Sequence, residues 1–139
     1  MGRSYLQEAS LKRGEGFDTL TLRELYRQIV NMCVGSTLVT GIELLLVEEP
    51  ILKLRAHLRG LVFIEVFFNE ETGKTSFALI KDSKRIFGVD NTRGWHIHPV
   101  DSPESHDPYE EISFESFLIQ VGKHKEKWEQ SRKDEGSTA

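Results

Sequence analysis

The sequence contains a single cysteine, Cys33, among its 139 residues. One cysteine excludes an intrachain disulfide and cannot supply a cysteine-rich zinc site. Because Cys33 falls on an apolar helical pattern, we interpret it as a small buried hydrophobe rather than a nucleophile. The sequence also lacks a run of about 18 apolar residues and a basic-then-apolar leader. We therefore expect a cytoplasmic protein with no membrane partner.

An excess of positive charge is also missing. The 18 lysines and arginines against 22 acidic residues give a net charge of −4, which does not favour binding of nucleic acid over the whole surface. No glycine-rich phosphate loop occurs, since Arg59-Gly60-Leu61 and the stretch 71–74 lack the required spacing. The length and the 38% hydrophobic content are typical of one soluble globular domain.

The polarity of the chain changes towards both ends. Residues 1–18 are polar and interrupted by glycines, and we expect a flexible arm there. Residues 19–122 carry the periodic apolar patterns of a single domain. Residues 123–139 are charged and finish in a Gly-Ser-Thr stretch, which predicts a frayed helix end and a disordered tail.

Two helices are predicted, one on each side of a strand-rich region. Thr21 and Glu24 fit a capping box at the start of the first helix, and Gly35 ends it. Ser113 is a suitable N-cap for the second, with Glu115 in its first turn. The apolar stripes of the two helices are formed by Leu22, Leu25, Ile29, Met32 and Cys33, and by Phe114, Phe117, Leu118 and Val121, with Trp128 as a candidate further member of the second.

Between the helices the apolar period changes to about two, which predicts strands. The expected strands cover residues 37–48, 51–59, 61–68, 75–81, 84–89 and 95–100. Their short connections force neighbouring strands to run antiparallel. The sequence therefore predicts an α+β domain: an antiparallel meander sheet of four to six strands, with the N-terminal and the C-terminal helix packed on one face.

The predicted strand 51–59 alternates apolar and basic residues. The basic-capable side chains on its solvent-facing side are Lys53, Arg55, His57 and Arg59, here called the basic stripe. One interpretation is a solvated face neutralised across the sheet by Glu43, Glu65 or Asp82. The other is a surface that binds a phosphate backbone.

The segment 85–108 concentrates titratable side chains. It holds His96, His98 and His106, with Asp90 and Asn91 just before them. The proline after His98 disfavours helix there. In an extended segment, residues two positions apart project from the same face, so the rings of His96 and His98 are expected side by side.

Three hypotheses for these histidines remain open. Together with Asp90 or Asp101 they could hold Zn²⁺ or Mn²⁺. Alternatively, they could act without a metal or other cofactor as acid and base in RNA cleavage, with positive charge from Arg85, Arg93 or the basic stripe. The third hypothesis is structural, with the imidazoles bonded to loop carbonyls. We take the metal-free reaction as the leading expectation.

The order of the elements and the motif residues of segment 85–108 resemble the TumE family of toxin–antitoxin toxins. The residues that carry this resemblance are Arg85, Asp90, Asn91, His96, His98, Pro99 and His106. The resemblance implies a small toxin that acts on RNA and has a cognate antitoxin as partner. It also implies site positions at Asp90, Asn91, His96, His98 and His106.

The expected site therefore has two parts. His96, His98, His106 and Asp90 are the expected catalytic residues; the expected RNA- and phosphate-binding residues are Asn91, Arg93, Arg85, Lys53, Arg55 and Arg59. The alternative is a non-catalytic interaction or dimerisation module with a degenerate site. The aliphatic run 44–47, with Phe63, Phe67 and Phe68, offers more apolar surface than two helices need to cover.

Overall fold

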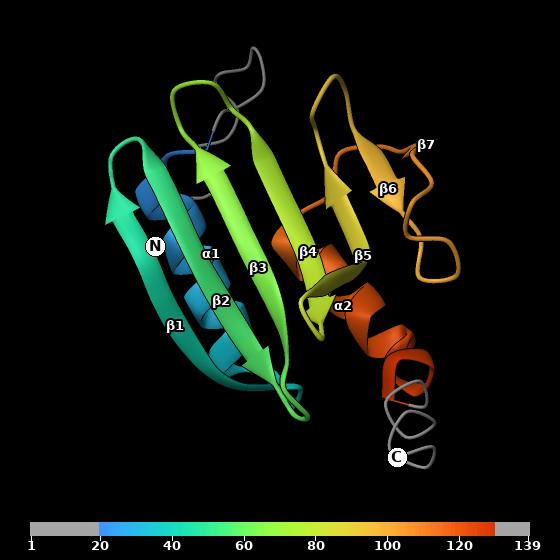
Figure 1. Ribbon diagram of the computed structural model, residues 1–139. Helices are drawn as coiled ribbons and strands as arrows, with labels where there is room; N and C mark the ends of the chain where they lie inside the picture. The colour runs from blue at the N-terminus through green and yellow to red at the C-terminus, as the bar shows by residue number, and fades with distance from the viewer. Residues whose placement is uncertain (1–19, 130–139) are drawn as a thin grey trace.

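The computed structural model describes residues 20–129 and contains a seven-stranded antiparallel sheet covered by two helices (Figure 1). The helices are α1 (Leu22–Val34) and α2 (Phe114–Lys123); the strands are β1 (Val39–Glu48), β2 (Ile51–Leu58), β3 (Val62–Asn69), β4 (Thr75–Lys81), β5 (Lys84–Asp90), β6 (His96–His98) and β7 (Asp107–Pro108). Each strand pairs with the next, so the sheet is a meander. The predicted α+β class is confirmed, and the two-residue β7 extends the sheet beyond the expected six strands.

Side-chain caps fix the starts of both helices. The Thr21 hydroxyl accepts from the Glu24 N–H at 3.1 Å, while the Glu24 carboxylate accepts from the Thr21 N–H at 3.0 Å. At α2, the Ser113 hydroxyl accepts from the Ser116 N–H at 3.1 Å. Both caps satisfy amides that have no partner within the helix, as the sequence predicted.

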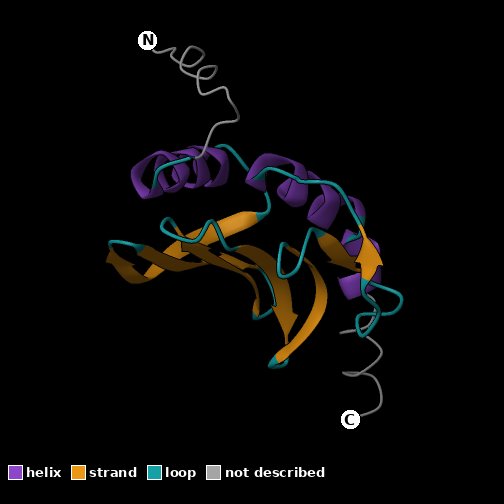
Figure 2. Cartoon of the chain, turned by 90° about the horizontal axis from the view of Figure 1, so that it is seen from above, coloured by secondary structure: helices purple, strands orange, loops and turns teal. Residues whose placement is uncertain are grey.

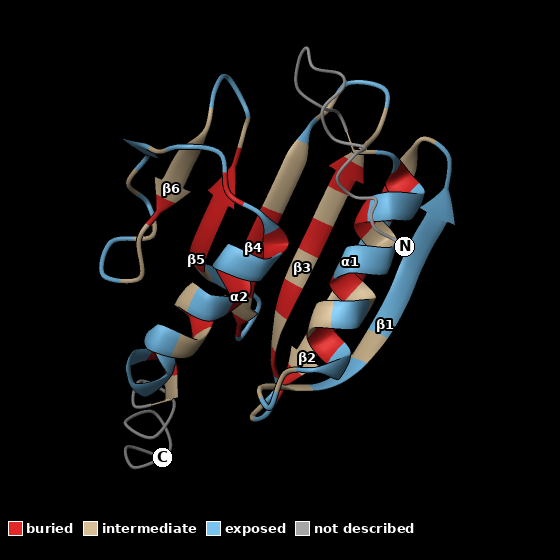
Figure 3. Cartoon of the chain, turned by 180° about the vertical axis from the view of Figure 1, so that it is seen from behind, coloured by how far each residue is buried: buried red, intermediate tan, exposed pale blue. Residues whose placement is uncertain are grey.

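The core lies between the two helices and one face of the sheet. Figure 2 shows both helices on the same side of the sheet, and Figure 3, viewed from that side, shows buried positions in both helices and in β3 and β5. The alternation in β2 buries every second residue, including Leu52, Leu54 and Ala56. The rings of Phe87 and Phe117 stack at a centroid distance of 5.1 Å and join β5 to α2. This packing leaves the opposite side of the sheet, the open face, without a covering helix.

The register of β4, β5 and β6 determines which residues share the open face. Gly88 pairs with Ala78 on one side and with His98 on the other. Asp90 pairs with His96 in the same way. Because directly opposed residues project from the same face, the carboxylate and both imidazoles lie together on the open face. Figure 1 looks onto this face, with both helices behind the sheet.

A bulge in the β4–β5 pair turns Arg85 to the same face. The register shifts between Leu79 and Ile80, so that Leu79 opposes Phe87 but Ile80 opposes Arg85. Without the shift, alternation from Gly88 would direct Arg85 towards the helices. The bulge therefore places a guanidinium on the face that carries the histidines.

The packed structure continues beyond residue 122, where the sequence predicted the end of the domain. Residues 125–129 form a further helical segment, and Trp128 in it is buried. The Trp128 indole N–H donates to the Val121 carbonyl at 3.0 Å, and the buried Lys81 ammonium donates to the Trp128 carbonyl at 3.0 Å. The predicted arm 1–18 and the last ten residues of the predicted tail lie outside the described residues.

Cys33 is 3% exposed, in the apolar face of α1, which confirms its interpretation as a buried hydrophobe. Within residues 20–129, no helix combines the length and the apolar character needed to cross a membrane.

Candidate functional site

Three imidazole rings converge at the β5–β6–β7 end of the open face. The ring centroids of His96 and His98 are 4.9 Å apart, those of His96 and His106 5.2 Å, and those of His98 and His106 4.5 Å. One ring nitrogen from each residue lies within 4.8 Å of the other two. We call these three residues together with Asp90 the histidine cluster. The same-face geometry predicted for His96 and His98 is confirmed.

Two connections bring these side chains together. A tight turn joins β5 to β6, in which Arg93 and Gly94 have positive φ values of 58° and 96° and the Gly94 N–H donates to the Asn91 carbonyl at 3.2 Å. After the loop that follows β6, β7 pairs beside His96 and returns His106 to the other two rings. His106 therefore depends on β7, a strand that the sequence did not predict.

Asp90 lies between two of the imidazoles. Its Oδ1 is 3.1 Å from Nε2 of His96, and its Oδ2 is 3.2 Å from Nε2 of His98. Burial raises the pKa of Asp90, but the Thr92 N–H and the two histidines outweigh burial, so the pKa lies below its usual value. Asp90 is thus a carboxylate held against two rings.

His98 is the buried member of the histidine cluster, with 1% of its surface exposed. Burial lowers the pKa of His98, and the positive charge of Arg85 lowers it further. Its Nε2–H donates to Asp90, which leaves the lone pair on Nδ1. Within residues 20–129, this Nδ1 is the one buried side-chain nitrogen or oxygen without a hydrogen-bond partner.

His96 and His106 give the histidine cluster its access to solvent. The His96 side chain is 15% exposed, and His106 is exposed. Nδ1 of His96 donates to the Gly94 carbonyl at 3.2 Å, since a carbonyl can only accept. The Nε2 atom of the same ring faces Asp90. A ligand from solvent would therefore reach His106 and His96 before His98.

Arg85 belongs to the same site. A Cβ built on Gly88 would meet the Arg85 Cδ at 3.0 Å, so the arginine stem lies over Gly88, the cross-strand neighbour of His98. The effect of its charge on the pKa of His98 agrees with this placement. Arg85 can therefore offer positive charge and hydrogen-bond donors beside the three rings.

The other predicted residues of segment 85–108 are used differently. The Asn91 side chain bonds the β3–β4 connection, accepting from the Thr75 N–H at 2.9 Å and donating to the Gly73 carbonyl at 2.9 Å. Arg93 is exposed in the tight turn. Asp101 accepts from Lys127 at 3.0 Å. The structure thus gives Asn91 and Asp101 contacts outside the histidine cluster.

The basic stripe lies away from the histidine cluster. β3 and β4 separate β2 from β5, and strands are about 4.8 Å apart, so the separation is roughly 14 Å. Arg55 contacts Glu65 at 3.3 Å and His57 contacts Glu43 at 2.8 Å, as the interpretation of a neutralised face predicted. Lys53 is exposed on β2, and Arg59 is exposed in the turn after it.

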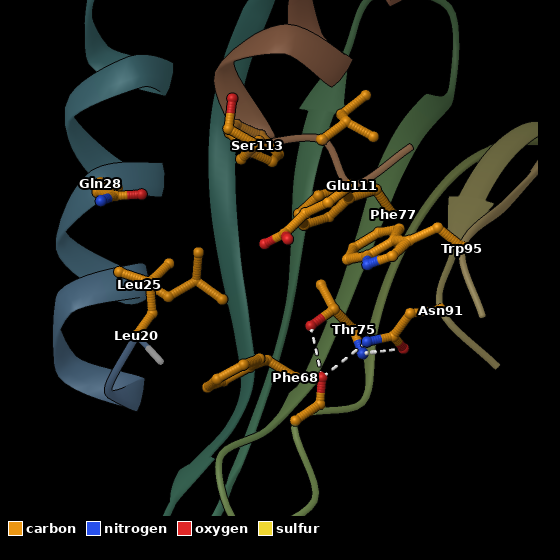
Figure 4. A pocket seen from close by; sticks show the side chains of 13 residues that line it. Leu20, Leu25, Gln28, Phe68, Thr75, Phe77, Asn91, Trp95, Glu111 and Ser113 are labelled. Carbon is orange, nitrogen blue, oxygen red and sulfur yellow. Dashed lines mark hydrogen bonds between the residues drawn. The ribbon is translucent and has the colours of Figure 1, made fainter. Parts of the chain in front are cut away.

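A cavity that the sequence did not indicate lies on the helix-covered side. It has a volume of about 370 Å³, and its wall includes Phe68, Phe77 and Trp95. Figure 4 shows the Glu111 carboxylate directed into this space between α1 and the start of α2. Its lining comes from both helices, from β3 and β4, and from several connections between elements, which no local sequence pattern links.

Comparisons of the chain with protein-family models, with curated proteins and with solved structures gave no match.

Proposed function

We propose that this chain is a small RNA-cleaving toxin of a toxin–antitoxin pair, and that the histidine cluster is its active site. The observation that supports the proposal most is the convergence of three imidazoles and one carboxylate on the accessible open face. The resemblance of segment 85–108 to TumE toxins favours RNA as the substrate and an antitoxin as the partner. In this proposal the chain would encounter the RNA and the antitoxin in the cytoplasm.

Cleavage of RNA at its 2′-hydroxyl needs a proton acceptor, a proton donor for the leaving 5′-oxygen, and positive charge on the phosphate. In this proposal the accessible rings of His96 and His106 contact the substrate. Arg85 binds the phosphate, since a guanidinium matches phosphate oxygens. His98 is too buried for direct contact, so it acts with Asp90 to position the other groups.

The test compares histidines inside and outside the histidine cluster. We expect His106→Ala and His96→Ala to lower RNA cleavage by about 10²–10⁴-fold and to relieve growth arrest. His57→Ala is the matched control, because His57 lies on the same face and contacts Glu43. Unchanged cleavage and toxicity in both cluster variants would refute the proposal.

The edge strand β1 supports a second candidate function, a non-catalytic interaction module. Residues 44–47 of this strand are between 38% and 48% exposed, although all four are leucine or valine. β1 is the first strand of the sheet and presents one unpaired edge, to which a partner strand could add. The partner would be an antitoxin segment or a second copy of this chain.

Two measurements test this second candidate. Light scattering reports the mass of the purified chain, and co-purification with the product of the neighbouring gene reports an antitoxin. We expect Leu45→Lys to abolish either association, because it places a charge on the exposed strand. A monomeric wild type that captures no companion would contradict the module.

A further inference from the structure

We propose that the histidine cluster binds one divalent transition-metal ion, Zn²⁺ or an ion of the same class, through His96, His98 and His106. The inference uses residues of the proposed active site but does not depend on RNA cleavage, because an ion could bind whether or not the chain is a nuclease. It replaces the sequence-based expectation that no metal is involved.

The spacing of the donors supports this proposal. One nitrogen of each imidazole lies within 4.8 Å of the others. Ligand nitrogens in a tetrahedral zinc site are about 3.3 Å apart, given Zn–N bonds of about 2.0–2.1 Å. The rings must therefore draw closer to bind one ion. His106 is exposed and precedes the two-residue β7, so it is the ring that can move with the least disturbance of the core.

The hydrogen bonds of two rings match those of metal ligands. Metal-binding histidines usually donate their second N–H to a carboxylate or a backbone carbonyl. His98 donates from Nε2 to the Asp90 carboxylate, and His96 donates from Nδ1 to the Gly94 carbonyl. His98 is thereby held with a lone pair on Nδ1, which is the form that binds a metal. Nε2 of His96 faces Asp90, and it must carry no proton when it binds the ion.

Two contacts remain unfavourable without a cation. The lone pair on Nδ1 of His98 is buried and has no partner, which costs free energy in a packed interior. In neutral His96, Nε2 also carries a lone pair, yet it faces Oδ1 of Asp90 at 3.1 Å. A metal ion bound to these rings would accept both lone pairs. It would compete with a proton for Nε2 of His96.

The donor type selects the class of ion. Imidazole nitrogens bind Zn²⁺, Cu²⁺ and Ni²⁺ well, whereas Mg²⁺ and Ca²⁺ prefer oxygen. Three protein ligands leave the fourth position of a tetrahedral ion for water or a substrate oxygen. Arg85 repels a cation, while the Asp90 carboxylate beside two of the rings offsets that charge. The open position next to a guanidinium suits a phosphate oxygen.

The experiment titrates Zn²⁺ into the untagged, EDTA-treated full chain by isothermal calorimetry. We expect one ion per chain, a higher Tm in its presence, and no comparable response to Mg²⁺. His106→Ala should weaken Zn²⁺ binding about tenfold or more, with circular dichroism confirming that the variant is folded. His57→Ala and His124→Ala, which alter histidines outside the cluster, should bind as the wild type does.

Co²⁺ gives a second measurement on the same protein. Tetrahedral Co²⁺ absorbs visible light, and we expect this absorption in the wild type and its loss in His96→Gln. Absence of binding, or equal affinity in wild type and His106→Ala, would overturn the metal site. RNA cleavage is assayed separately: Zn²⁺ binding without cleavage would refute only the proposed function, and cleavage without Zn²⁺ binding only this inference.

Discussion

At the scale of single residues, Asp90 connects structure and chemistry. Its carboxylate contacts His96 and His98 and accepts from the Thr92 N–H at 3.0 Å. Removing it would leave the Nε2–H of a buried imidazole without an acceptor. Asp90 therefore serves the packing of this end of the sheet as well as any reaction there.

We predict that Asp90→Ala lowers the free energy of unfolding by about 1–3 kcal/mol, because a buried donor loses its partner. Urea denaturation followed by circular dichroism measures this change. Glu71→Ala, an exposed substitution, is the control and should stay within about 0.5 kcal/mol of the wild type. Equal stability of Asp90→Ala and the control would show that the contacts of Asp90 contribute little.

Cys33 allows a prediction about pH. Burial raises the pKa of the Cys33 thiol to about 11, while an unfolded chain has a thiol pKa of about 8.5. The unfolded state therefore loses its proton first, and the stability associated with the thiol is present below about pH 8.5 and declines as pH rises towards 11. Across this window the wild type should lose unfolding free energy relative to Cys33→Ala, so its advantage over the variant at neutral pH should narrow as pH rises.

The same burial controls the reactivity of the thiol. We expect iodoacetamide to leave Cys33 unmodified in the folded chain at pH 7 and to alkylate it in urea, as mass spectrometry would show. Rapid alkylation of the folded chain would contradict the buried position of Cys33 in α1.

At the scale of elements, local sequence signals predicted most of the sheet and both helix starts. Capping residues such as Thr21 and Ser113 act within one helical turn, so their pattern is visible in the sequence. The same holds for the alternation that places His96 and His98 on one face. β7 was missed, because two residues carry no periodicity and their pairing depends on β6.

The site was predictable only in part for a related reason. The position of Arg85 depends on a bulge between Leu79 and Ile80, and register shifts leave little trace in composition. The basic stripe was correctly placed on the open face, but the order of strands keeps it away from the histidine cluster. The distance between two strands depends on their order in the sheet, and the residue pattern of each strand does not predict that order.

Gly88 in β5 gives a prediction at this scale. A Cβ at Gly88 would meet the Phe77 carbonyl oxygen at 3.2 Å and displace the stem of Arg85. We expect Gly88→Ala to cost about 1–3 kcal/mol in unfolding free energy and to weaken RNA cleavage. Gly41→Ala is the matched control, since nothing lies within 4 Å of a Cβ at that strand position. The two variants are compared by urea denaturation and a cleavage assay.

At the scale of the whole molecule, the C-terminal segment completes the core. Trp128 is 3% exposed, and its carbonyl accepts from the buried Lys81 at the end of β4. The sequence predicted a frayed end after residue 122, because the surrounding residues are charged. One buried indole and one buried ammonium hold this segment. Trp128 fits the apolar spacing of the second helix, but one apolar residue among charged ones did not predict packed structure there.

We predict that Trp128→Ala lowers the free energy of unfolding by about 3–5 kcal/mol, since it removes a large buried side chain. The Tm by differential scanning calorimetry should fall accordingly, whereas Lys125→Ala, an exposed change in the same segment, should leave it nearly unchanged. A small effect of Trp128→Ala would show that residues 125–129 are dispensable for the fold.

The meander also lets the strands pair in the order in which a ribosome synthesises them. Each strand pairs with the strand just synthesised, so β1 to β7 can assemble as they emerge. The helix that covers Phe77 and Phe87 is made after the histidine cluster. A nascent chain that stops before Phe114 therefore carries the complete cluster on a sheet whose apolar side is covered by α1 alone, and Phe77 and Phe87 lack the Phe117 ring that packs on them. Apolar surface exposed in this way promotes aggregation. Translation through α2 and Trp128 is thus needed to cover the apolar side of the sheet that carries the histidines.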